Sequence, residues 1–189
     1  LIRSKNLRNS VFIVMLSALF AANLHFHLAG ATRVDPLLLA INVILLMVAM
    51  VGGRTLPAFT SSGLKQQGID IKIPRYPPLD IAALMAALAI LIIDIFFQGT
   101  TIAAVAATLT AILLALRLAR WQGHRTLHDP IIWVLHIAYA WLPVGLALKA
   151  AWLFGAPIPD TSWIHALTAG AFSTMILAIM SRAALGHTG

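Results

Sequence analysis

Histidines are the residues of this sequence best suited to chemistry. The chain contains seven histidines and six aspartates, but no cysteine and no glutamate. The absence of cysteine excludes disulfides, iron–sulfur clusters, thiolate zinc sites and covalent attachment of a c-type heme. A metal or a heme in this chain must therefore rely mainly on imidazole ligands.

The spacing of three histidines suggests two sites at different depths in a membrane. His165 and His187 are 22 residues apart, which at 1.5 Å per helical residue separates them by roughly 33 Å, about the thickness of the hydrocarbon layer. His136 follows Pro130 by roughly 9 Å of helix. A b-type heme needs one or two neutral imidazoles at comparable depth on facing helices. We therefore expect His136 and His187 to share one heme site and His165 to serve another metal site.

Each histidine also has a structural interpretation. His136 is also consistent with a packing residue bonded to a backbone carbonyl, and His165 with an interfacial residue near a helix start. His25 and His27 are two residues apart, so they point in different directions around a helix; at most one is expected to face a metal, and both are consistent with an interfacial position. We place His124 and His128 in a solvated loop.

Two arginines are candidates for binding the heme propionates. Arg54 and Arg182 lie near the ends of apolar stretches, where a cation commonly anchors a helix to lipid headgroups. Arginine also pairs bidentately with carboxylates. We therefore expect both arginines near the site of His136 and His187, as anchors or as propionate partners.

The elements that position these residues are membrane helices. The sequence is 60% apolar and only 10% charged, with a mean hydropathy of +0.91, which is typical of integral membrane proteins. Its net charge of +7 comes from bases that flank apolar runs, so it indicates lipid headgroups and not nucleic acid. We predict an all-α, polytopic helix bundle forming one membrane domain, with about six spans at residues 9–30, 36–53, 79–98, 101–121, 131–154 and 163–186.

The distribution of Lys and Arg predicts the orientation of the spans. Only Arg33 and Lys149 are expected on the outer side, whereas the other eleven of the 13 basic residues lie on the opposite side. Because Lys and Arg concentrate in cytoplasmic loops, both termini should face the cytoplasm. We expect residues 60–78 to form the longest loop, Asp94 to be interfacial, and the fifth and sixth spans to pack through Ala166, Gly170 and Thr174.

Three blocks of the sequence resemble a known family. These are GGRTLPAFT at 52–60, WVLHIAYAWLPVGLAL at 133–148 and HALTAGAFSTMILAIMSRAALGHTG at 165–189, and they are similar to the NnrS family. The resemblance implies a multi-pass protein of the bacterial inner membrane, associated with heme b and copper, that supports resistance to nitric oxide and nitrosative stress. Family members are about twice as long, with roughly twelve spans, so we expect this chain to be a fragment.

Within the resemblance, Arg54, His136, His165, Arg182 and His187 fall in the matching blocks and are the first candidates for metal chemistry. His25 and His27 rank second. The leading hypothesis is a heme-binding membrane protein that senses, carries or scavenges nitric oxide or protects iron pools. The alternatives are a membrane oxidoreductase that reduces nitric oxide at a heme and metal centre, and a small-solute transporter, which usually has charges or broken helices at the midplane. No catalytic motif decides between them.

The orientation can be tested with a topology reporter. A reporter fused after Gly155 should behave as periplasmic, because the segment between the fifth and sixth spans lies on the side poor in Lys and Arg. Phosphatase and fluorescent-protein fusions at the same position provide matched, opposite readouts. Cytoplasmic behaviour at this position would overturn the assignment of every histidine to a side.

Overall fold

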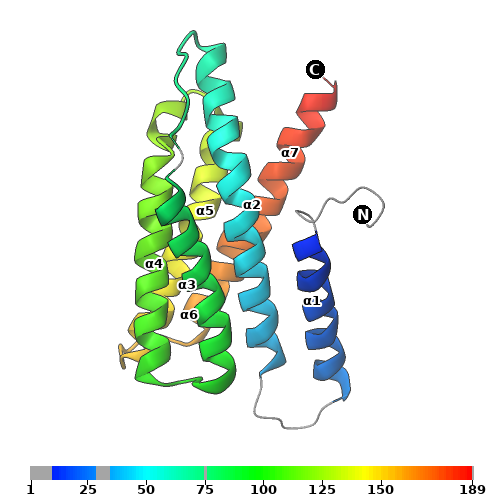
Figure 1. The fold of residues 1–189 in the computed structure, drawn as a ribbon, viewed down its shortest axis with the longest axis vertical. Coiled ribbons are helices and arrows are strands. Elements are labelled where there is room, and N and C mark those ends of the chain that lie inside the picture. Colours follow the sequence, from blue (N-terminus) through cyan, green and yellow to red (C-terminus); the bar gives the residue numbers. More distant parts are fainter. Residues whose placement is uncertain (1–9, 29–34, 75, 189) are drawn as a thin grey trace.

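The protein is a bundle of membrane-length helices. The computed structural model describes the backbone of residues 10–28, 35–74 and 76–188, with side chains as far as Leu185. Within these residues six helical stretches are long and apolar enough to cross a membrane, and no strand is present, which confirms the predicted fold class. The helices are α1 Ser10–Leu28, α2 Pro36–Gln66, α3 Pro77–Phe96, α4 Thr101–Arg120, α5 Pro130–Leu153, and a sixth stretch made of α6 Thr161–His165, η3 Ala166–Ser173 and α7 Thr174–Thr188, with a short 3₁₀ turn, η2 Gly123–Thr126, before α5 (Figure 1).

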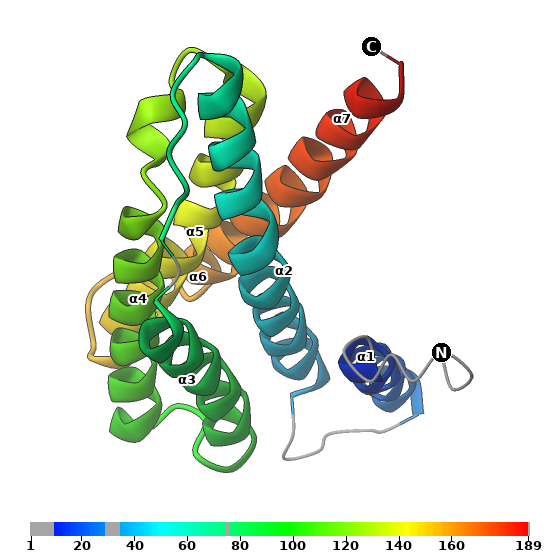
Figure 2. The same ribbon diagram turned by 45° about the horizontal axis from the view of Figure 1, so that its top comes forward.

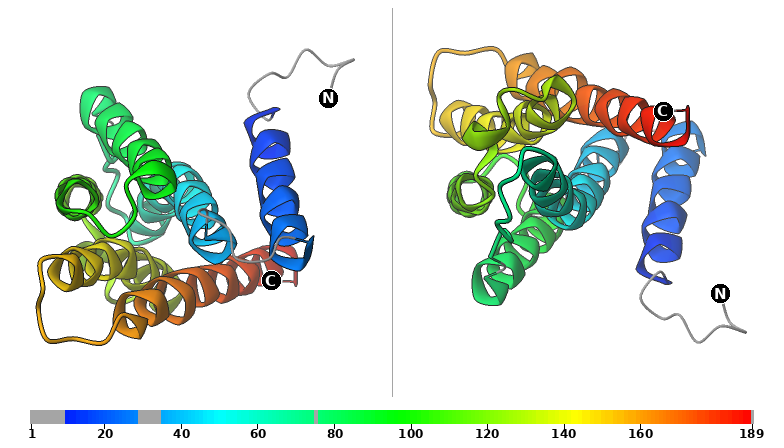
Figure 3. Two further views of the ribbon diagram at one scale, coloured as in Figure 1. Left: turned by 90° about the horizontal axis from the view of Figure 1, so that it is seen from below. Right: turned by 90° about the horizontal axis from the view of Figure 1, so that it is seen from above.

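Helices α2 to α5 form the compact part of the bundle. Helix α4 packs along α5 and α3, whereas α1 packs against α2 (Figure 1). Helix α7 leans away from α4 and α5 toward its carboxyl end (Figure 2), and α1 stands at the periphery when the bundle is seen end on (Figure 3). Many apolar side chains of α1, among them Val14 and Phe20, are exposed, as expected for a helix that faces lipid.

The two ends of the bundle differ in charge, and we name them accordingly. The Lys/Arg-rich end contains the end of α2, the end of α4, η2 and the start of α5; the opposite end contains the starts of α2, α4 and α6 (Figure 1). Among the described residues, Lys149 is the one Lys or Arg near the opposite end. The basic residues toward the Lys/Arg-rich end are Arg54, Lys65, Lys72, Arg117, Arg120, Arg125 and Arg182.

Short polar side chains define where several helices begin. The Asp35 carboxylate accepts hydrogen bonds from the amides of Leu37 and Leu38, and Pro36 occupies the first position of α2. Asp129 and Pro130 start α5 in the same way. These caps satisfy amides that have no partner inside the helix, and proline costs nothing there because it lacks the amide hydrogen.

Helix α2 extends far beyond the expected end of its span. We expected a span ending near Gly53 and a loop from residue 60, but the helix continues through Pro57 to Gln66, and only residues 67–76 connect it to α3. Leu56, Thr60, Gly63 and Leu64 are buried on one face of this extension. Burial of that face against the bundle outweighs the bond that Pro57 removes, and the prediction was wrong because it relied on local helix breakers alone.

The sixth membrane-length stretch contains a π-helical segment that the sequence did not indicate. Between α6 and α7 the backbone of Ala166–Ser173 is π-helical. The hydroxyl groups of Ser173 and Thr174 donate to the carbonyls of Thr168 and Ala169, five residues earlier. Because the carbonyls of a π-helix accept from amides five residues later, these hydroxyls add a second donor to two of them and support the irregular segment.

The expected packing of the fifth helix against the sixth stretch is confirmed. Gly170 lies against the Trp141 ring so closely that a Cβ atom at this position would lie 2.8 Å from it. One turn away, Gly145 of α5 receives the side chain of Leu167. Ala166 is also buried. Small residues therefore bring the two backbones together, as is usual between membrane helices.

Replacing Gly170 by Leu should destabilise the protein. The new side chain would overlap Trp141, and overpacking of this kind typically costs about 1–3 kcal/mol. Unfolding in mixed micelles measures the effect. The matched control is Ala169→Leu, one residue away at an exposed position, which should leave stability nearly unchanged; equal stability of the two variants would contradict the close packing.

Candidate functional site

His136 is buried between three elements near the Lys/Arg-rich end. Its side chain is 8% exposed. Nδ1 lies 3.0 Å from the carbonyl oxygen of Ile132, one turn earlier in α5, and Nε2 lies 3.2 Å from Oγ1 of Thr60 in α2. The ring also packs on the backbone of Gly123, where a Cβ atom would overlap it. The expected contact of His136 with a backbone carbonyl is therefore present.

His136 and Thr60 together make more polar contacts than they have hydrogens to donate, if the imidazole is neutral. Oγ1 of Thr60 also lies 2.8 Å from the carbonyl oxygen of Leu56. A neutral imidazole and one hydroxyl supply two hydrogens for three contacts, two of which end on carbonyls that can only accept. If Nδ1–H donates to Ile132 and Thr60 donates to Leu56, Nε2 keeps a lone pair that receives no hydrogen. This is the tautomer that metal-binding histidines adopt, in which the second ring nitrogen donates to a backbone carbonyl.

Arg182 lies at the same level of α2 as His136. Its guanidinium carbon is 5.6 Å from the centre of the Phe59 ring, and Phe59 is the neighbour in sequence of Thr60, which contacts His136. Nε of Arg182 is buried and has no hydrogen-bond partner among the described residues. A buried donor of this kind is costly unless an acceptor satisfies it, and a carboxylate is the acceptor that best matches an arginine.

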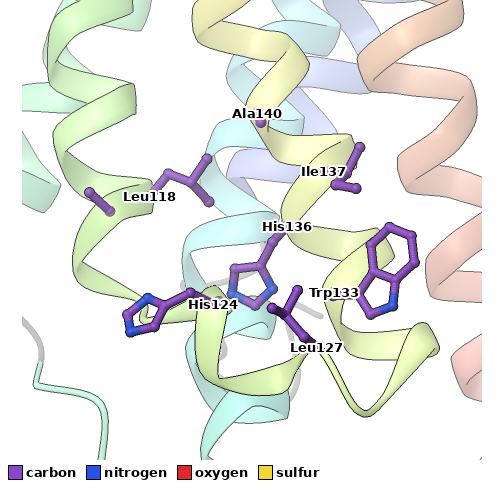
Figure 4. Close-up of a pocket in the computed structure, with 9 residues that line it drawn as sticks. Leu118, His124, Leu127, Trp133, His136, Ile137 and Ala140 are labelled. Atoms are coloured by element: carbon purple, nitrogen blue, oxygen red, sulfur yellow. The ribbon is translucent and has the colours of Figure 1, made fainter.

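An apolar cavity also borders His136. It has a volume of about 330 Å³ and lies between the end of α4, η2 and the start of α5 (Figure 4). His136 projects from α5 toward the segment that carries His124, which also lines the cavity (Figure 4). A groove of about 530 Å³ shares Leu118, Ala119 and Ala140 with it and continues between α4 and α5. These volumes fall within the range of small-molecule sites.

His124 is a residue that the sequence argument set aside. We expected a solvated loop, but His124 belongs to the 3₁₀ turn η2 and lines the cavity beside His136. Its exposed ring has no hydrogen-bond partner among the described residues. The i, i+4 spacing of His124 and His128 was the available signal, but in the structure only His124 reaches the cavity.

The remaining predicted site residues are distributed over the bundle. Arg54 is exposed on α2. His165 is exposed at the opposite end, and its Nδ1 lies 2.7 Å from the carbonyl oxygen of Thr161, which leaves Nε2 without a partner in the described part of the chain. His25 is half-buried and His27 exposed near the end of α1. The side chain of His187 lies outside the described residues, so its pairing with His136 stays a prediction.

The described residues do not bring several candidate metal ligands together. Within them, no group of three or more His, Cys, Asp or Glu side chains lies close enough to hold a metal ion. Heme needs only one or two imidazoles, whereas copper and other non-heme centres usually take three or more protein ligands.

Arg117 forms a buried polar network that the sequence argument missed. Arg117 lies in the last turn of α4, but its side chain is buried. Nε donates to the Asp80 carboxylate at 2.6 Å, and Nη1 donates to the carbonyl oxygen of Ala49 at 2.7 Å and to the Tyr139 hydroxyl at 3.2 Å. The guanidinium occupies the space above Gly53, where a Cβ atom would overlap it.

Asp94 belongs to a second buried network near the opposite end, which corrects its predicted interfacial position. It is 4% exposed, and the Lys149 ammonium donates to its Oδ2. Nδ2 of Asn42 donates to the same oxygen at 2.7 Å. Asp94 lies close to the end of α3, but the start of α2 and the end of α5 cover it and supply its partners.

These features define the class of protein: a multi-pass helical membrane protein with paired charges inside the bundle and histidines at both ends. The protein-family model described as "NnrS protein" matches residues 1–189, the whole chain. The chain therefore belongs to the NnrS family, as the resemblance indicated. No curated protein sequence and no solved structure matches it.

Because Asp80 is the carboxylate paired with the buried Arg117, we expect its removal to destabilise the protein strongly. Asp80→Ala leaves a buried cation without a carboxylate, which should cost about 3 kcal/mol, near the lower bound for broken buried pairs because Asp80 is 28% exposed. Adding Arg117→Met should recover part of this loss, since an apolar replacement of both partners is often nearly neutral. Unfolding free energies of the single and double variants measure the coupling.

The control for this prediction is Arg120→Ala. Arg120 lies 4.9 Å from the centre of the exposed Tyr76 ring, and an exposed cation–π contact contributes only about 0.5–1 kcal/mol. If Asp80→Ala costs no more than Arg120→Ala, the Arg117 pair does not stabilise the bundle.

Proposed function

We propose that this protein is a heme-binding component of the bacterial inner membrane that supports resistance to nitric oxide and nitrosative stress. Two observations support the proposal: membership of the NnrS family and the environment of His136. The second carries it, because the Ile132 carbonyl can only accept, so Nδ1 of a neutral ring carries the hydrogen and Nε2 keeps a lone pair beside the Thr60 hydroxyl.

In this proposal His136 and Arg182 hold the heme. His136 would offer Nε2, exchanging its contact with Thr60 for the iron, while the Ile132 carbonyl keeps the ring oriented. Arg182 would pair through its unsatisfied Nε–H with a propionate, at the level of α2 where Phe59 and Thr60 lie. When bound, heme supplies an iron atom that takes nitric oxide as a ligand.

Further residues extend the candidate site. His187 follows Arg182 by five residues in α7 and stays a candidate second imidazole. His124 is another, since it lines the cavity beside His136 and its ring has no partner in the described part of the chain. Arg54 is a candidate for the second propionate. The apolar walls of the cavity would exclude water from the bound group.

Binding or protection is favoured over reduction of nitric oxide. Reduction at a dinuclear centre needs a second metal close to the heme, and that metal needs its own ligands. The described residues contain no cluster of three candidate ligands. We therefore propose heme as the cofactor and do not assign a copper site to these residues.

The visible absorption spectrum of the purified, native protein tests the proposal. We expect a Soret band that moves on addition of nitric oxide. His136→Ala should remove or shift this band, because it removes the proposed ligand, whereas His128→Ala, an exposed histidine outside the cavity, should leave it unchanged. Arg182→Ala should lower heme occupancy, and Arg182→Lys should restore part of it.

The outcomes separate the function from the site. A native protein without color, iron or copper overturns the heme proposal and favours a transporter. A normal Soret band in a folded His136→Ala variant overturns only the role of His136, which then becomes a packing residue. Thermal stability of each variant shows whether it is folded.

A further inference from the structure

The buried pair of Asp94 and Lys149 lies within membrane-spanning helices. Both side chains are almost inaccessible, at 4% and 3%. They join α3 to α5, and Asn42 adds a hydrogen bond from α2. Charged groups inside a membrane are costly and usually mark a path for ions or protons. A purely apolar contact between these three helices would stabilise the bundle as well or better, so the pair needs a further explanation.

A cavity leads from this pair toward the opposite end of the bundle. It has a volume of about 130 Å³, and Lys149 forms part of its wall. Its other walls include Ile41 of α2, Gln98 and Gly99 of the turn between α3 and α4, and Trp163 of α6. Because this turn and the start of α6 lie at the end of the bundle (Figure 1), the cavity extends from that end to Lys149, whose ammonium donates to Asp94.

An unsatisfied donor lines the same cavity. Trp163 is 6% exposed, and its Nε1 is buried without a hydrogen-bond partner in the described part of the chain. The Lys149 ammonium lies 5.0 Å from the centre of the Trp163 ring. A buried N–H without an acceptor is rare in proteins, and ordered water is its usual partner at a polar and roomy site.

The charges around the cavity favour water over an anion. Asp94 balances Lys149, and two further carboxylates, Asp35 and Asp160, lie in the wall. Both already accept amide hydrogen bonds, at Leu37 and Leu38 and at Thr161. Asn42 is the polar neighbour from α2, and the described part of α4 contributes no charge at this end. An anion would be repelled, whereas the cavity has room for several waters.

We propose that this cavity is a water-filled entrance through which Asp94 exchanges protons with the aqueous phase at the opposite end of the bundle. Hydronium transfers its proton to the Asp94 carboxylate and becomes water; the reverse step returns the proton. The Lys149 side chain donates a hydrogen bond to Oδ2 and so stabilises the carboxylate form. This proposal does not rest on the proposed heme function, because it concerns residues at the other end of the bundle.

Cysteine accessibility tests the entrance. The chain has no cysteine, so each introduced cysteine is the only thiol. Ile41 and Leu45 are buried one turn apart on α2, but only Ile41 lines the cavity. In liposomes, Ile41→Cys should react with aminoethyl methanethiosulfonate at least about ten times faster than Leu45→Cys, because the reagent needs water to reach a thiol. Leu38→Cys, also in the wall, is the second variant if Ile41→Cys fails to fold. Equal rates would overturn the entrance.

Infrared difference spectroscopy tests the proton exchange. Lowering the pH should produce a carboxylic acid band that is absent in Asp94→Asn and retained in Asp35→Asn and Asp160→Asn. If no pH-dependent band disappears in a folded Asp94→Asn variant, Asp94 does not exchange protons and the proposal fails.

Discussion

The guanidinium of Arg117 is the interaction on which the arrangement of the bundle depends most. It extends from α4 and bonds to Asp80 of α3, the Ala49 carbonyl of α2 and Tyr139 of α5. Four helices therefore meet at one charge that lipid cannot solvate. Gly53 leaves the space that the guanidinium occupies. Once this contact forms, the relative rotation of the four helices is fixed, and with it the faces that they present to α1 and α7.

A second ion pair, between Asp94 and Lys149, joins helices at the opposite end of the bundle, as the pair of Arg117 and Asp80 does at the Lys/Arg-rich end. Each pair links α3 to a different helix, α5 in one case and α4 in the other. Between the two levels the packing consists mainly of apolar and small side chains, such as Ala83, Ala87 and Ala107. Van der Waals packing alone specifies helix rotation weakly in lipid. Two polar contacts at different depths are therefore sufficient to fix both rotation and vertical register.

Local patterns predicted the helices well and the polar contacts poorly. Hydropathy and helix-start signals located the spans, because both act over a few residues. The start signals are an aspartate cap followed by proline, as in Asp35–Pro36 and Asp129–Pro130. Arg117 and Asp80 are 37 residues apart, and Lys149 and Asp94 are 55 apart, so their pairing depends on the rotation of whole helices. The same reason explains α2, where burial of the face around Thr60 overrode the local effect of Pro57. His136 was recognised because a histidine deep in a span is unusual in itself.

Tertiary packing also explains why the two ends of the bundle suit different chemistry. At the Lys/Arg-rich end, Phe59 and Thr60 are adjacent on α2 and contact Arg182 and His136, respectively. Nε of Arg182, which has no acceptor among the described residues, and the His136 imidazole therefore lie at one level of α2, and the heme that we propose would meet both there. At the opposite end, the ion pair is internally balanced and borders a cavity with carboxylates in its wall. That environment suits water and protons, so the two sites that we propose, for heme and for proton entry, lie at opposite ends of the bundle.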